Sequence, residues 1–297
     1  MKARKKLLVL LASAFILNLN AQEGGNQAEI VSTQAGLNVT NGEKGTFFIS
    51  PYYELTRFKG LKLKELTGNI TFPEGSSSLN SDQSDIDDYN SQYRSEYQSG
   101  NTGIRFGYQV LNGLGLSVNT GITHFGFKSF VNRENENARS FASDYPAMTF
   151  GVSVDYLKVF YKKLTAVALL SYNYCLTGKS ETYFNSSEKE TILSSSLHSR
   201  YWQFNLAIAY PLGKFLPFAG AGFTQQFVKS KSTAGIDYTN DEGLVEYSEL
   251  ELNPLYSGGA FYGFAGLEYR LNKGASVYIR SSFPDPLRAN IGFRIAL

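Results

Sequence analysis

The chain has 297 residues, and its 28 Lys and Arg only slightly outnumber its 26 Asp and Glu. The first 21 residues hold four of the basic residues and no acidic ones, so the remainder has 24 basic and 26 acidic residues, a net charge of −2. A chain without a basic excess lacks the electrostatic footprint of a nucleic-acid-binding protein, and one cysteine excludes a disulfide framework.

The first 21 residues have the pattern of a secretory signal peptide. Four basic residues between positions 2 and 6 precede an apolar run at 7–19, and the small residue Ala21 closes the segment. This run is shorter than the roughly 20 residues that a membrane-spanning helix needs. We therefore predict a signal peptide at residues 1–21, with cleavage after Ala21.

Apolar and polar residues alternate in about ten of the later segments, as they do in strands with one apolar face. No apolar run of 18 residues follows the signal peptide, so we expect no transmembrane helix. The predicted strands are 46–58, 101–111, 114–130, 146–159, 164–176, 199–211, 215–228, 257–271, 274–283 and 287–297.

The connections between these segments alternate in length. The short ones are 112–113, 161–163, 212–214 and 272–274, and the long polar ones are 59–100, 131–145, 177–198 and 229–256. Only 284–286 is a short connection where a long one is expected. Short turns at one rim and long loops at the other are typical of a transmembrane barrel. We predict an all-β, antiparallel, up-and-down transmembrane β-barrel of about ten strands. Eight or twelve remain as alternatives, because 61–72 could be an extra strand or an extension of the first.

The strand register places the charged residues on one face, opposite apolar rows such as those at 148–156 and 202–210. A soluble sandwich could show the same alternation, but an Arg or Lys that faces lipid costs roughly 2–4 kcal/mol at the bilayer midplane. We therefore expect the charges to face the lumen. The favoured interpretation is a charge network that fills it, and the alternative is an arginine-lined path that prefers anions. The predicted set is Glu54, Arg105, Asp155, Glu268, Arg270, Arg280, Arg288 and Arg294.

The last eight residues resemble the β-signal by which outer-membrane barrels are recognised for insertion. That pattern is polar, any, Gly, any, any, hydrophobic, any, hydrophobic, and Asn290, Gly292, Ile295 and Leu297 occupy its fixed positions. Leu297 stands where an aromatic residue is most common. The motif itself covers only eight residues, whereas the predicted architecture of the whole mature chain is similar to that of such barrels. The resemblance points to the outer-membrane β-barrel superfamily of porin-like and OmpA-like barrels, and to no specific member.

This resemblance implies a location in the outer membrane, with outer-membrane lipid and the barrel-assembly machinery as partners. Residues 44–297 would form the barrel. Residues 22–43 are weakly patterned and would form an N-terminal periplasmic arm.

The candidate catalytic and metal-binding patterns are incomplete. Ten strands is also the size of the omptin proteases, and Asp85 and Asp87 are similar to the paired aspartates of that family. Neither His198 nor His124 has the Asp two residues before it that the family's site requires. His198 and Ser199 could suggest a lipid esterase in which His activates Ser, but adjacent residues in an extended chain point to opposite faces, which disfavours their direct pairing. Counted from Asp85, a calcium loop lacks its glycine at the sixth position. We predict no catalytic residues, no cofactor and no metal.

The predicted function is a structural or surface-binding role without catalysis. The long segments 59–100 and 229–256 would meet an extracellular ligand or a protein partner. The alternative is a narrow, passive, weakly anion-preferring channel for small solutes. A third hypothesis is an omptin-like or lipid-hydrolysing membrane enzyme.

Overall fold

The computed structural model describes residues 44–72, 75–131, 137–142, 146–160, 164–186, 189–239, 245–272 and 274–297. The predicted signal peptide and the predicted arm at 22–43 lie outside these residues.

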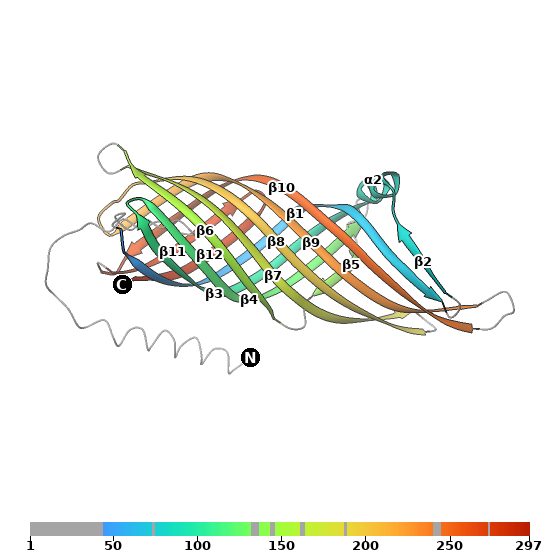
Figure 1. Cartoon of the computed structure of the whole chain (residues 1–297). Helices are drawn as coiled ribbons and strands as arrows, with labels where there is room; N and C mark the ends of the chain where they lie inside the picture. Colours follow the sequence, from blue (N-terminus) through green and yellow to red (C-terminus); the bar gives the residue numbers. More distant parts are fainter. Residues whose placement is uncertain are drawn as a thin grey trace.

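Ten long antiparallel strands close into a barrel (Figure 1). Neighbours in the ring are hydrogen-bonded in the order in which they are named here, and the last strand pairs with the first. The ring strands are β1 (Phe47–Phe72), β3 (Tyr93–Leu111), β4 (Leu114–Val131), β6 (Ala147–Val159), β7 (Thr165–Ser186), β8 (Lys189–Ala209), β9 (Phe215–Thr239), β10 (Val245–Arg270), β11 (Ala275–Phe283) and β12 (Leu287–Ala296). The predicted fold class and strand number are therefore confirmed. Two short strands lie outside the ring: β2 (Gly75–Asn80) pairs with β1, and β5 (Asn137–Ala142) pairs with β4.

Tight turns join the strands at the end of the barrel that carries the C-terminus (Figure 1). Gly113 and Gly213 adopt positive φ angles of 81° and 63°, which glycine tolerates because it has no Cβ. The predicted turns at 112–113 and 212–214 lie at this rim, as do Asn272 and Gly274, whereas 161–163 and 273 lie outside the described residues.

The prediction that the long segments at the other rim are loops is wrong, because much of their length is β-strand. The strands continue through much of these segments: β1 extends to Phe72, β7 and β8 pair as far as Ser186 and Lys189, and β9 pairs with β10 as far as Thr239 and Val245. Outside the hydrocarbon both faces of a strand can be polar, so the alternation that identifies a strand is lost while its hydrogen bonds remain. Residues 61–72 are thus an extension of the first strand.

An α-helix, α2 (Gln83–Gln92), lies within 59–100, which we predicted as a long polar loop of an all-β chain. The Asp82 carboxylate accepts a hydrogen bond from the Asp85 backbone N at 3.0 Å, and the Asp85 carboxylate accepts one from the Asp82 N at 3.3 Å, which caps the helix. The Asn90 amide forms two hydrogen bonds of 2.9 Å with the backbone of Leu63, which ties α2 to β1. No described helix is long and apolar enough to cross a bilayer.

The apolar face of the sheet changes sides along the strands. In β4, Val118 and Ile122 are exposed on the outer face, and Asn119 is buried on the inner face. Further toward α2 the pattern reverses, because Phe125 is buried inside and His124 is exposed outside. The barrel thus has a membrane half, apolar outside and polar inside, and an extramembrane half, built like a soluble barrel with an apolar interior.

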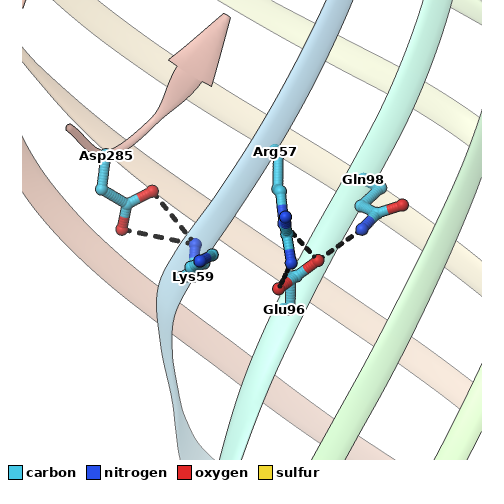
Figure 2. Close-up of polar contacts among 5 residues, drawn as sticks. All are labelled: Arg57, Lys59, Glu96, Gln98 and Asp285. Carbon is cyan, nitrogen blue, oxygen red and sulfur yellow. Dashed lines mark hydrogen bonds and ion pairs between the residues drawn. The ribbon is translucent and has the colours of Figure 1, made fainter. Parts of the chain in front are cut away.

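The terminal hairpin of β11 and β12 lies between β10 and β1 and ends before these two longer strands do. β11 and β12 have 9 and 10 residues, whereas β1 and β10 have 26 each. Beyond the hairpin tip, β1 pairs directly with β10 from Lys62 to Thr71, so the ring loses two strands there. At the tip, the Asp285 carboxylate accepts hydrogen bonds from the Lys59 backbone N at 3.1 and 3.3 Å (Figure 2). Asp285 therefore satisfies the backbone at the point where β1 changes partner.

Candidate functional site

The predicted charge set lies on the lumen side of the membrane half. Asp155, Glu268, Arg280, Arg288 and Arg294 are buried. Glu54, Arg105 and Arg270 are half-buried. Five arginines and three carboxylates share the space, and Glu268 lies near both Arg294 and Arg270. The structure therefore brings these charges together in one layer of the lumen, which also holds apolar side chains such as Leu169 and Leu216.

Polar side chains from opposite walls meet across this layer. Arg280 Nη2 on β11 donates to Asn205 Oδ1 on β8 at 3.2 Å, and the Tyr262 hydroxyl donates to the same oxygen at 2.5 Å. Arg288 on β12 donates to Gln203 on β8. Because β12 and β8 are four places apart in the ring, this contact spans the lumen.

Aromatic rings hold several of the guanidinium groups. The Arg280 Cζ lies 3.9 Å from the centroid of the Phe264 ring, and the Arg294 Cζ lies 5.1 Å from that of Phe48. The negative face of an aromatic ring attracts a cation and replaces part of its lost hydration. Our sequence prediction did not include these rings, although the alternation places Phe48 and Phe264 on the inward face.

A layer of apolar side chains closes the lumen on the α2 side of the charges, and we name it the apolar septum. Phe127 on β4 and Tyr256 on β10 have ring centroids 4.6 Å apart, although these strands are three places apart at this level. The layer draws on eight ring strands and on α2. Its members are Phe58, Leu61, Leu63, Ile86, Tyr97, Phe125, Phe127, Ala147, Cys175, Leu197, Val228 and Tyr256. The apolar septum thus spans the whole barrel.

A second apolar cluster lines β6 to β10 on the short-turn side of the lumen. Between these apolar clusters, the described residues line two small cavities of about 20 Å³ each, of which only the first has a mainly polar lining. Tyr52, Arg105 and Asn173 contribute to one, and Thr149 and Ser199 contribute to the other. Each of these two cavities holds roughly one water molecule.

Two residues of the predicted insertion signal also pack the lumen. The buried Asn290 side chain donates a hydrogen bond to the Glu54 carboxylate at 3.1 Å. Gly292 lies directly beneath the ring of Tyr278, where an added methyl group would overlap the ring atoms. The glycine is therefore required by packing, whatever its part in recognition.

The other two signal residues lie at the short-turn rim. Ile295 pairs with Ile49 of β1 and with Ala275 of β11. The Leu297 backbone N donates to the Phe47 carbonyl at 2.8 Å, which holds the end of the chain against β1.

The candidate catalytic residues are not brought together. Asp85 and Asp87 are exposed on α2, and the Asp85 carboxylate is part of the helix cap. His198 lies on the outer wall with its Nδ1 3.5 Å from the Tyr174 hydroxyl, whereas Ser199 points into the lumen. Within the described part of the chain, no group of three or more His, Cys, Asp or Glu could hold a metal ion.

Neither a family model nor a curated protein matches the chain. Among solved structures, it is similar to the outer membrane protein OprG from Pseudomonas aeruginosa, with 10% identity, a TM-score of 0.38, and coverage of 86% of this chain and 98% of that one. It is also similar to the translocator domain of autotransporter NalP from Neisseria meningitidis, with 8% identity, a TM-score of 0.38, and coverage of 99% of this chain and 95% of that one. The outer membrane protease OmpT from Escherichia coli has 9% identity and a TM-score of 0.31, and the match covers 83% of this chain and 94% of that one.

The assignment of this chain rests on its own geometry. A closed antiparallel ring leaves no unpaired sheet edge in lipid, and lipid-exposed side chains such as Val152, Leu206 and Ile279 are more than half exposed on the outer wall. The charges lie inside, as a membrane barrel requires. The chain therefore has the fold and the outer surface of a transmembrane β-barrel.

Proposed function

We propose that this protein is a sealed barrel that acts through its extramembrane half, in a structural or surface-binding role without catalysis. The observation that carries the proposal is the apolar septum, because a hydrophobic constriction excludes water and ions. A solute that entered from the α2 side would meet this layer of 12 buried side chains.

The extramembrane half offers a rigid support for recognition. The paired extensions of β7 with β8 and of β9 with β10 continue the sheet past the membrane half, and α2 is fixed to β1 through Asn90. A preorganised surface of this kind loses little conformational entropy when it binds a partner. We therefore place the surface-binding role on the rim that carries α2.

The only cysteine of the chain, Cys175, tests the seal. Its side chain is 4% exposed and belongs to the apolar septum. We expect a small charged thiol reagent to leave Cys175 unmodified in the folded barrel and to label it after unfolding. As a matched control, Ser76→Cys in a Cys175→Ala background should be labelled rapidly, because Ser76 is exposed on β2. Labelling of folded Cys175 at the rate of the control would overturn the proposal.

The channel and enzyme hypotheses predict different results. A water-filled path would expose Cys175 to the reagent. A hydrolase would show peptide or lipid cleavage that falls in the His198→Ala or Asp85→Ala variants. We expect the purified barrel to have no such activity, and activity that depends on either residue would contradict the absence of catalysis.

A further inference from the structure

Basic residues cross the outer wall of the barrel in a row, which we name the basic arc: Lys62 on β1, Lys229 on β9 and Arg200 on β8. Lys62 lies opposite Ser257, Ser257 opposite Phe227, and Phe227 opposite Arg200. Lys229 is two residues from Phe227, on the same face. Neighbouring strands are about 4.8 Å apart, so the row from Lys62 to Arg200 is roughly 14 Å long.

The basic arc lies at the edge of the apolar belt. Trp202 is two residues from Arg200 on the same outer face, and its ring centroid is 5.2 Å from that of Phe223. Phe223 in turn lies 4.8 Å from Phe261, which is 81% exposed. Aromatic side chains gather where hydrocarbon meets headgroups, so the basic arc lies at headgroup level on the α2 side.

The three cations of the basic arc are exposed, and within the described part of the chain they form no ion pair. Nearby basic residues differ in this respect. Arg57 donates to both carboxylate oxygens of Glu96 at 2.7 and 2.9 Å (Figure 2), and Lys231 lies 2.6 Å from Glu251. The basic arc therefore presents positive charge that the protein itself does not neutralise.

We propose that the basic arc binds the phosphate group of an anionic lipid in the leaflet on the α2 side of the membrane. Ammonium and guanidinium groups form charge-assisted hydrogen bonds with phosphate oxygens. Arg200 is positioned for this contact, because its Cζ lies 5.0 Å from the centroid of the Phe227 ring. The acyl chains of the same lipid would lie along the apolar belt beside Trp202. Each basic residue near an anionic membrane surface adds about 1 kcal/mol, or roughly fivefold in affinity.

Trp202 is the only tryptophan of the chain, and it reports on lipid beside the basic arc. The experiment compares quenching of its fluorescence in phosphatidylcholine vesicles that contain a small fraction of either brominated phosphatidylglycerol or brominated phosphatidylcholine. We expect several-fold stronger quenching by the anionic lipid at equal fractions. Equal quenching of the wild-type protein by the two lipids would overturn the proposal.

Variants assign the preference to the basic arc. In the triple variant Lys62→Gln, Arg200→Gln, Lys229→Gln, both brominated lipids should quench the Trp202 fluorescence equally. In Lys62→Arg, the anionic lipid should still quench it more strongly. Lys158→Gln is the matched control, because Lys158 is exposed on the outer wall near the short-turn rim. A preference that persists in the triple variant, or that is lost in the control, would contradict the assignment.

Competition with inorganic phosphate distinguishes binding of a lipid phosphate from binding of free phosphate. Added to the buffer at the concentration of the lipid phosphate, it should leave the preference unchanged, and removal of the preference would overturn the lipid assignment. The inference requires only the position of the barrel in the membrane, so it is independent of the proposed seal of the lumen.

Discussion

Replacement of Gly292 by alanine tests whether lumen packing or recognition fixes this residue. The added methyl group would overlap the ring of Tyr278, which is 1% exposed and has little room to move. Overpacking of a filled interior costs typically 1–3 kcal/mol, so we expect a loss of about that size in the free energy of unfolding. The assay is urea unfolding of the reconstituted barrel, followed by Trp202 fluorescence.

Two further variants complete this test. Gly263→Ala is the matched control in a ring strand, because its added methyl group would have no neighbour nearer than 3.6 Å, and its effect should stay within about 0.5 kcal/mol. In a Tyr278→Ala background the cost of Gly292→Ala should largely disappear. A full loss of assembly by Gly292→Ala that remains without the Tyr278 ring would refute the packing argument and assign the glycine to the insertion signal.

Three other predictions follow from the contacts described above. Asp285→Asn should destabilise the barrel by about 1.5–3 kcal/mol and speed hydrogen exchange at the Lys59 amide, because a charged acceptor is lost; unchanged exchange would contradict this. The hydrogen bond from Lys231 lowers the pKa of Glu251, which lies beyond the membrane half, so the stability it contributes is present above the ordinary carboxylate pKa and lost as the pH falls through the lowered value. Glu251→Gln should remove this acid dependence of exchange in the β9–β10 extension. Deletion of Ile295–Leu297 should block assembly, measured as loss of heat-modifiable migration.

The membrane half could be predicted from sequence because lipid imposes a strict rule on it. Each outward position between Ile104 and Tyr108, for example, must be compatible with hydrocarbon, so the alternation is visible without structural information. The inward position of Arg105 follows from the same rule. Which aromatic ring or amide each arginine meets could not be predicted, because those contacts join strands that are distant in the chain.

The extramembrane half obeys a weaker rule, and there the prediction of loops was wrong. The outer face of this half meets water and not lipid, so its outward positions need not be apolar and the alternation is weak in strands such as the end of β1. Two signals could have corrected this. Asp82 and Asp85 have the spacing of a helix cap before Ile86, and in β4 the apolar face moves from Ile122 to Phe125, which marks both the lipid boundary and the apolar septum.

Single-channel recording of the wild-type protein in planar bilayers is the most direct test of the central claim that the apolar septum seals the barrel. The account predicts no conductance steps, because the apolar septum brings side chains from distant ring strands into contact across the lumen. Reconstitution is verified in the same sample by heat-modifiable migration. Stable, anion-selective conductance from barrels that pass this check would contradict the account.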